Sequence, residues 1–448
     1  MTPSIHASWN STVNTLSFKV RSLPQSLLMV LAAGLILRTL VVSFHQRPLI
    51  SDEREYNKLA YNLATQGSYS YDGTPTAYRP VGYPAFVAAI YTLKYSPLLV
   101  KYLQVLLDLL TALFLYLILG GFDTRIRILA AAVWAFYPPA MLYANFLMSE
   151  TLFTFLLVVG LYLLTTIESR SPGFLLFLGI IHGILVLIKP NFLLFLLAAG
   201  FLAQRLKFSR RQIGTIAIGI LLVTFPWLLR NYVRLDTPSL STNGGINLLI
   251  GNNPNATGAY AINFPPEAIA GAANEVEVDR MATGFALRFI LDEPGRFLLN
   301  GARKIAHLLS SEGGLLVWSF HDDPETASIR YAGKYAAIPF GLIVLINLPY
   351  VLILLSGIVG FISLPRERIW WLMLLLFLTW VATHAITFGG SRFHFPLMPF
   401  LTLCAVPVLS NVRGVLGKLS ARSRLVAAVL ILLCIAVWVY EAITVINA

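Results

Sequence analysis

Five charged side chains of this sequence stand beside or between apolar segments, where water and lipid would meet. They are Asp52, Arg79, Glu150, Lys189 and Arg392. A carboxylate in such a place can remove the proton of a hydroxyl group as a general base. Arginine and lysine can stabilise negative charge that develops on a phosphate. These residue types therefore suit the transfer of a group from a lipid-linked phosphate to a hydroxyl acceptor.

Each of these residues also has a plain structural alternative. Asp52 with Glu55 three residues later fits a capping box, and acids in a first helical turn suit the helix dipole. Glu150 can serve the dipole of its own helix in the same way. Lys189 can extend from a helix end toward water, and Arg392 can bind a lipid headgroup. Only their joint placement on one side of a membrane favours chemistry.

The segment SDEREYNKLAYNLATQG, residues 51–67, must hold the first of these acids. Its apolar side chains recur at helical spacing, at Tyr56, Leu59, Ala60 and Leu63. This spacing predicts one helical face, and Gly67 is a natural stop. We expect the helix to lie in the membrane interface, with Asp52 and Glu53 at its N-terminal tip.

The composition indicates a polytopic membrane protein. The chain has 448 residues, of which 57% are hydrophobic and 12% charged, and its mean hydropathy is +0.73. A soluble globular protein needs more polar surface than this. The net charge of +12 does not indicate nucleic acid, because the basic residues lie mostly between the apolar segments.

Eleven segments are expected to cross the membrane, which gives an all-α fold. They are residues 26–44, 97–119, 128–145, 150–167, 173–188, 190–204, 213–229, 336–363, 369–388, 395–410 and 424–446. Residues 82–95 are also apolar, but a 14-residue helix covers only about 21 Å of a hydrocarbon core about 30 Å thick. We interpret this segment as a second interfacial helix.

The basic linkers fix the expected orientation. Without a crossing at residues 82–95, the linkers around residues 125–127, 205–211, 366–368 and 413–424 share a side with the N-terminus. The positive-inside rule then places the N-terminus in the cytoplasm. The compact loops favour a bacterial inner (plasma) membrane. The five charged residues above would face the periplasmic, extracytoplasmic side.

This topology predicts three regions. Residues 1–229 form an N-terminal transmembrane module whose first outer loop, 45–96, carries the first acids. Residues 230–335 form a large extracytoplasmic loop, in which 240–260 is rich in glycine and asparagine and thus in turns. Pro294 and Gly295 divide its later part into two helices. Residues 336–448 supply the C-terminal transmembrane helices.

The remaining ionisable residues support fewer inferences. Arg38 and Asp108 fall inside predicted spans, and intramembrane charges are costly enough that we expect them to pair. His182, His384 and His394 are dispersed without metal-ligand spacing. His321, Asp322 and Asp323 form either a cation site or a polar turn. No cofactor is certain; a divalent cation remains possible and its ligands unknown.

At these positions the chain resembles the GT-C glycosyltransferases, the broad group that includes protein O-mannosyltransferases and lipid A aminoarabinose transferases. The resemblance rests on residues 51–69, on AYRPVGYPAFVAAIY (77–91), FLMSETLFTFLL (146–157), IKPNFLL (188–194) and residues 225–254, and on GGSRFHFPLMPFL (389–401). It spans most of residues 26–410.

The resemblance implies roles for the five residues. Asp52 would be the catalytic base and Glu150 the second catalytic acid, while Arg79, Lys189 and Arg392 would bind the donor phosphate. Related enzymes with this fold generally invert the anomeric configuration. Tyr78 stands where the aminoarabinose transferases have an acid, so their sugar specificity is not carried over.

Further substrate contacts are expected from residues beside these positions and in the large loop. The candidates are Glu53, Tyr56, Tyr83, Asn243, Asn247, Asn252 and His394.

The sequence thus predicts a membrane glycosyltransferase of the cell envelope. It would move a sugar from a polyprenyl-phosphate donor, such as one on undecaprenyl phosphate, to an acceptor hydroxyl on a lipid, a glycan or a protein. Two alternatives stay open: a transporter or lipid flippase, and a GT-C glycan polymerase or ligase. A transporter predicts repeated halves with polar residues near the midplane, and the sequence shows no repeat.

Overall fold

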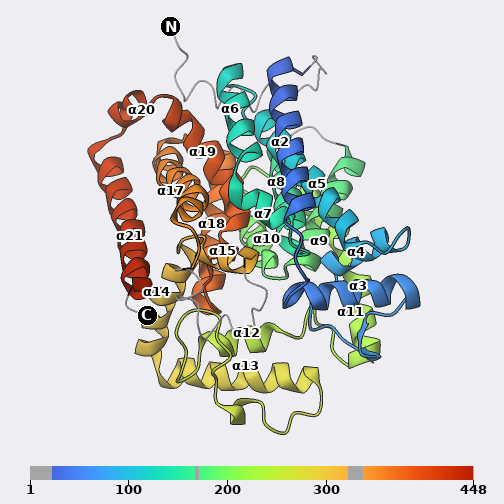
Figure 1. The fold of residues 1–448 in the computed structure, drawn as a ribbon. Helices are drawn as coiled ribbons and strands as arrows, with labels where there is room; N and C mark the ends of the chain where they lie inside the picture. Colours follow the sequence, from blue (N-terminus) through green and yellow to red (C-terminus); the bar gives the residue numbers. More distant parts are fainter. Residues whose placement is uncertain (1–22, 167–170, 321–336, 447–448) are drawn as a thin grey trace.

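The computed structural model describes residues 23–166, 171–320 and 337–446, and they form a bundle of helices (Figure 1). Within this described part, seven segments are long and apolar enough to cross a membrane. They are α2 (Gln25–Phe44), α5 (Pro97–Ile118), α11 (Arg210–Leu235), α17 (Phe340–Ser363), α18 (Arg368–Ile386), Ser391–Ser410 with α19 (Met398–Ser410), and α21 (Ala421–Ile446). The predicted class, an all-α polytopic membrane protein, is confirmed.

The predicted number of eleven spans is not confirmed. Helices α6 (Thr124–Ala135) and α7 (Pro138–Ala144) form an eighth span if the pair, bent by 52°, is counted once. Four other apolar helices are shorter, namely α4 (Gly82–Tyr91), α8 (Ser149–Thr165), α9 (Pro172–Ile188) and α10 (Phe192–Phe201). A helix of 17 residues such as α8 or α9 reaches about 26 Å, slightly less than the hydrocarbon core.

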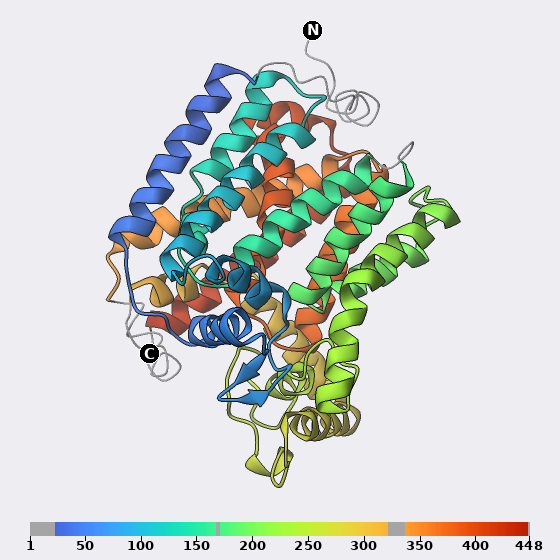
Figure 2. The same cartoon turned by 90° about the vertical axis from the view of Figure 1, so that its right-hand side faces the viewer.

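The non-spanning elements gather at one end of the bundle, which we call the loop face (Figures 1 and 2). They are α3 (Asp52–Gln66), the hairpin β1 (Ser70–Tyr71) and β2 (Thr74–Pro75), α12 (Gly244–Gly251), η2 (Pro266–Ala268), α13 (Glu275–Asp292), α14 (Pro294–Leu308) and α15 (Gly313–Phe320). The turns η3 (Ser391–Phe393) and η4 (Phe395–Leu397) precede α19, and α20 (Val412–Lys418) lies at the opposite end of the bundle.

Two of these helices follow the sequence pattern closely. In α3, Tyr56, Leu59 and Ala60 are buried, and Gly67 ends the helix at φ 62° with its N–H on the Leu63 carbonyl, 3.2 Å away. Helices α13 and α14 meet at Glu293, next to the predicted break. The expectation of turns across 240–260 was wrong in part, because α12 forms within it.

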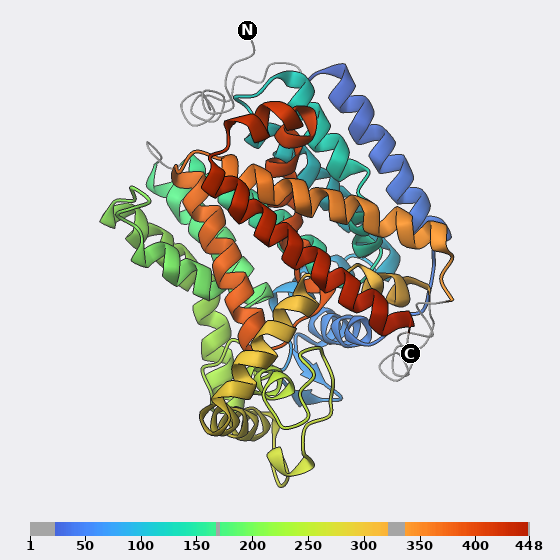
Figure 3. The same ribbon diagram turned by 90° about the vertical axis from the view of Figure 1, so that its left-hand side faces the viewer.

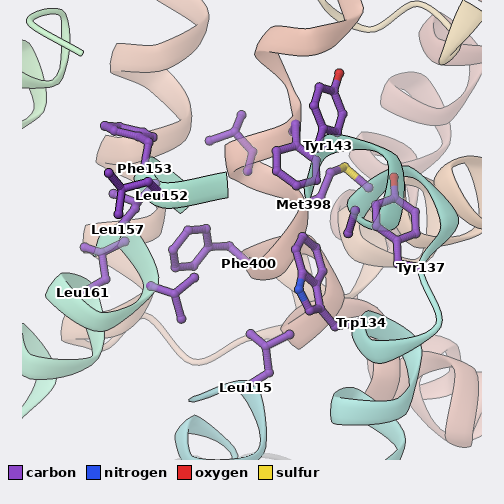
Figure 4. Close-up of a cluster of buried hydrophobic side chains, with 14 of the residues drawn as sticks. Leu115, Trp134, Tyr137, Tyr143, Leu152, Phe153, Leu157, Leu161, Met398 and Phe400 are labelled. Carbon is purple, nitrogen blue, oxygen red and sulfur yellow. The ribbon is translucent and has the colours of Figure 1, made fainter. Parts of the chain in front are cut away.

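The core lies among α5, α6, α8 and α19, where aromatic and aliphatic side chains interdigitate (Figure 4). Phe400 of α19 lies between Phe153 of α8 and Trp134 of α6 in this view. At the periphery, α21 packs along α17 (Figure 3) and leaves most of its apolar surface facing outward. An apolar outer surface is expected where lipid is the solvent.

The expected pair of Arg38 and Asp108 forms, with 2.6 Å between Nη2 and Oδ2, and both side chains are buried. Trp134 Nε1 donates to the other oxygen of Asp108 at 2.9 Å. The guanidinium also donates to the carbonyl groups of Trp134, at 3.0 Å, and Ala135. These carbonyls are at the end of α6, where Pro138 prevents the helix from continuing. The pair therefore joins α2, α5 and the α6–α7 bend.

We predict strong coupling between these two charges. Asp108→Ala should destabilise the protein by about 3–5 kcal/mol, because it leaves the Arg38 guanidinium buried without a counter-ion. The double variant Arg38→Met/Asp108→Ala should cost clearly less than the single changes Arg38→Met and Asp108→Ala added together. Thermal unfolding of the purified protein in detergent measures all three variants. Additive costs would contradict a direct pair.

Candidate active site

Asp52 lies between two arginines that come from opposite ends of the sequence. Its Oδ1 is 2.7 Å from Arg79 Nη2, and its Oδ2 is 2.8 Å from Arg392 Nη1. Arg79 also contacts Glu55, with 2.5 Å between Nε and Oε2. Asp52 and Glu55 are one helical turn apart on α3, so both carboxylates face the same guanidinium. The site is thus a cluster of two carboxylates and two guanidinium groups.

The capping alternative for Asp52 is wrong. Asp52 is the first residue of α3, after Ser51, and no side chain caps the helix. Ser51 has φ 44°, a left-handed conformation that residues other than glycine rarely adopt. The neighbouring Glu53 holds this strained turn in place. Its oxygens accept from the N–H of Leu147 at 2.7 Å and pair with Arg47 at 2.8 Å.

The two arginines keep Asp52 ionised. Burial alone would raise the pKa of Asp52, but the charges of Arg392 and Arg79 outweigh it and lower the pKa to about 2. Burial also lowers the affinity of Arg79 for its proton, but Asp52 more than compensates, so the pKa of Arg79 is well above its usual value. Asp52 in this state is a weak base, because its pKa lies far below neutral pH.

A second ion pair lies at the ends of two apolar helices. Glu150, in the first turn of α8, is 3.2 Å from Lys189, which follows the last residue of α9. Glu150 is 3% exposed, and among the described residues its Oε2 has no hydrogen-bond partner. A buried carboxylate oxygen of this kind favours a donor from water or a ligand.

Tyr56 connects the two pairs. The charges of Asp52, Glu150, Arg79 and Arg392 all act on this tyrosine, whose pKa burial raises to about 12. Its ring lies edge-on to Tyr83, with 5.1 Å between centroids. Four of the five predicted residues therefore lie around one buried tyrosine, and the fifth, Lys189, pairs with Glu150.

Close backbone approach allows α4 to begin beside the second pair. A Cβ on Gly82, the first residue of α4, would lie 2.7 Å from the backbone N of Ile188. Only glycine fits such a contact without displacement. Ile188 immediately precedes Lys189, so this contact sets the distance between the first loop and the second ion pair.

Contacts from the large loop fix the position of Arg79. The Glu275 carboxylate accepts from the Thr76 hydroxyl at 2.5 Å and the Ala77 N–H at 2.7 Å. Arg230 donates to the carbonyl groups of Thr76, at 2.8 Å, and Tyr69, at 2.5 Å. These bonds hold the chain just before Arg79. Nothing in the sequence indicated Glu275 or Arg230, because their partners are more than a hundred residues away.

A cavity of about 310 Å³ adjoins the cluster. Its walls include Glu55, Tyr78, Arg79 and Glu275, together with the β1–β2 hairpin. This volume falls at the lower end of the range for small-molecule sites, about 300–1,000 Å³. The cavity gives a substrate access to Arg79 from the loop face.

The other predicted contact residues have partners of their own. Tyr83 donates to Gln104 at 2.8 Å, and Asn243 accepts from Ser241 at 3.1 Å. The Asn252 amide bonds to Lys304 and to the backbone at 2.9 Å or less. Asn247 lies in α12, where its backbone N–H donates to the Asn243 carbonyl at 3.0 Å, and His394 contacts Glu312 at 3.1 Å.

The described residues include no group of side chains suited to the divalent cation considered from the sequence. Among the residues that the structure describes, no three histidine, cysteine, aspartate or glutamate residues are grouped to hold an ion. His321, Asp322 and Asp323 lie outside the described residues.

Three solved structures are similar to this chain. ArnT from Cupriavidus metallidurans, bound to undecaprenyl phosphate, matches with a TM-score of 0.51 at 14% identity, over 90% of this chain and 62% of that one. An apo oligosaccharyltransferase from Archaeoglobus fulgidus matches with a TM-score of 0.43 at 15% identity, over 92% of this chain and 55% of that one. ArnT from Cupriavidus metallidurans in the apo state matches with a TM-score of 0.40 at 15% identity, over 84% of this chain and 76% of that one.

The first of these likenesses shows the fold. ArnT is a lipid A aminoarabinose transferase of the GT-C type, so the chain has the predicted GT-C fold. The chain spans about three fifths of the length of that ArnT structure, since it covers 62% of it. No protein-family description and no curated protein sequence matches the chain.

The Asp52 cluster predicts a definite dependence of stability on pH. The pKa of Asp52 is about 2 in the folded protein and about 3.9 in an unfolded chain. Ionised Asp52 therefore stabilises the fold fully above about pH 4, by on the order of 2 kcal/mol, and this is lost as the pH falls toward about 2.

Thermal unfolding of the wild type and Asp52→Asn across this range tests the prediction. Their difference in stability should stay constant from pH 7 to about 4.5 and shrink below about pH 4. A difference that stays constant down to about pH 2 would show that the pKa of Asp52 is ordinary, and a wild type that gains stability relative to Asp52→Asn as the pH falls below about 7 would show that this pKa is raised.

Proposed function

We propose that the protein is a membrane glycosyltransferase that moves a sugar from a polyprenyl phosphate to an acceptor hydroxyl. The observation that carries this proposal is Asp52 held between Arg79 and Arg392, with Glu150 and Lys189 beside them. The cluster supplies a carboxylate base and several cations at the ends of apolar helices. Those are the groups that the transfer of a lipid-linked sugar requires.

The donor phosphate binds to Arg392 and Lys189. Both residues stand at helix ends next to apolar segments, so a polyprenyl tail in the bilayer can bring its phosphate to them. Arg79 completes the cationic wall on the side of the cavity. The ArnT structure that resembles this chain contains undecaprenyl phosphate, which supports the same class of donor here.

Donor binding also activates Asp52. The phosphate competes for the Arg392 guanidinium, which forms strong charge-assisted bonds with phosphate oxygens. Asp52 then loses one of the two charges that lower its pKa. Its proton affinity rises toward the range in which a carboxylate acts as a general base. The base is therefore weak before the donor binds and stronger afterwards.

The transfer is a single displacement. The acceptor oxygen attacks the anomeric carbon while Asp52 takes the hydroxyl proton, and the bond between that carbon and the phosphate oxygen breaks. The polyprenyl phosphate leaves with the electron pair, and Arg392 and Lys189 stabilise its charge. Attack opposite to the leaving group inverts the anomeric configuration.

Glu150 and the cavity serve the acceptor side. The second carboxylate oxygen of Glu150 can accept a hydrogen bond from a hydroxyl group of a bound sugar. The cavity beside Arg79 lets a lipid, glycan or protein acceptor approach Asp52 from the loop face. The basic linkers orient this face toward the outside of a bacterial plasma membrane.

The donor site predicts that lipid retention depends on two cations. Native mass spectrometry of gently extracted protein should show bound polyprenyl phosphate, lost by at least about tenfold in Arg392→Ala and in Lys189→Ala. Arg296→Ala is the matched control, because this exposed arginine of α14 donates to the Pro254 carbonyl at 2.8 Å and lies over the Phe289 ring, and it contacts none of the five site residues in the described chain. Phospholipids alone in the wild-type sample, even after donor is added, would refute the donor site.

Asp52→Asn separates binding from chemistry. The variant keeps the shape of the side chain but cannot take a proton, so it should retain polyprenyl phosphate and lose transfer by at least about a hundredfold. Transfer is measured as the release of free polyprenyl phosphate from the sugar-loaded donor in membranes. A folded variant with most of its activity would show that another group is the base.

A further inference from the structure

A buried acid and histidine lie directly behind Arg392. Glu312, between α14 and α15, is 0% exposed, and His394, two residues after Arg392, is 3% exposed. His394 Nε2 is 3.1 Å from Glu312 Oε1, and His394 Nδ1 is 2.8 Å from the Leu308 carbonyl. The function proposed above uses neither residue.

The hydrogen bonds of His394 define where its protons are. A carbonyl oxygen can only accept, so Nδ1 carries a proton and donates it to Leu308. The contact between Nε2 and Glu312 Oε1 gives the second ring nitrogen a partner. Both ring nitrogens therefore have partners, which makes the burial of the imidazole tolerable. Loss of either partner would leave a buried polar group unpaired.

The pair fixes the turn that carries Arg392. Arg392 lies in η3 (Ser391–Phe393), and the N–H of His394 donates to the Ser391 carbonyl at 3.1 Å. The imidazole also stacks on the Tyr350 ring, with 4.4 Å between the ring centroids and an angle of 13° between the ring planes. On the other side of the turn, Trp380 Nε1 donates to the Phe393 carbonyl at 2.7 Å. The backbone after Arg392 is thus held on two sides.

Packing contacts connect this pair to the turn of Arg392 through α15 and α7. The Tyr137 and Tyr143 hydroxyls point away from the apolar cluster around Phe400 (Figure 4). The Tyr143 ring lies against Phe395, which follows His394, with 4.2 Å between ring centroids. Arg392 lies over the ring of Trp318, 5.7 Å from its centroid, and Trp318 is in α15, which begins just after Glu312. Glu312 therefore belongs to the surroundings of Arg392 and not to a separate part of the core.

We propose that Glu312 and His394 form a positioning pair that holds Arg392 ready for the donor phosphate. This inference rests on the proposed function. Arg392 must leave Asp52 when phosphate binds, so its position cannot depend on Asp52 alone. The pair supplies a support that does not change during this exchange. It contributes to phosphate affinity through Arg392 and touches no substrate itself.

A double-mutant cycle tests the pair. The probe is undecaprenyl phosphate, titrated into the full-length protein in nanodiscs and measured by native mass spectrometry. Glu312→Gln should weaken binding by about tenfold, as loss of a group that orients a ligand-binding residue typically does. In an Arg392→Ala background, the same change should have no further effect.

The matched control is Glu441→Gln. Glu441 of α21 is a half-buried carboxylate nearby, and it accepts from the N–H and hydroxyl of Ser311, each at 2.8 Å. This change should leave binding within about twofold of the wild type. His394→Gln gives a second variant in case Glu312→Gln fails to fold, which the thermal unfolding midpoint reveals.

The outcomes separate the two proposals. If the wild type binds no undecaprenyl phosphate, the proposed function fails, and the pair has no role in it. If Arg392→Ala weakens binding while Glu312→Gln and His394→Gln do not, only the positioning pair is overturned. An equal loss in the Arg392→Ala background would also overturn it, because the effect would then be structural and not act through Arg392.

Discussion

The structure depends on one carboxylate shared by two arginines. Asp52 joins the first loop, through Arg79, to the segment before α19, through Arg392, across 340 residues of sequence. Charges held this far from bulk water must be paired, because an isolated one is too costly. The supports around them follow from that need: Glu275 and Arg230 hold the Arg79 segment, and Glu53 holds the turn before Asp52.

Much of the fold was predictable because the relevant signals are local. The apolar face of α3, the stop at Gly67 and the break near Pro294 each depend on a few neighbouring residues. The pairing of Arg38 with Asp108 followed from the cost of charge in lipid. The number of spans was less certain, because helices of 17 residues lie close to the length limit and α6 and α7 bend sharply at Pro138.

The candidate site was likewise predictable only where the signal is local. Five charged residues could be selected from sequence because they fall on the same expected outer face, four beside apolar segments and Arg79 in the loop between the two interfacial helices. Glu55 was visible but fitted a helix cap equally well, and only the structure shows its contact with Arg79. Glu275 and Glu312 gave no signal. Their roles come from tertiary contacts, and a single sequence contains no record of which distant residues meet.

The central claim is that the donor phosphate takes Arg392 from Asp52. A structure of the full-length protein in nanodiscs with bound polyprenyl phosphate tests it most directly. We expect the phosphate within hydrogen-bonding distance of Arg392 and Lys189, and the contact between Asp52 and Arg392, now 2.8 Å, to be broken while Arg79 stays on Asp52. A phosphate bound elsewhere, or an unchanged contact between Asp52 and Arg392, would contradict the account.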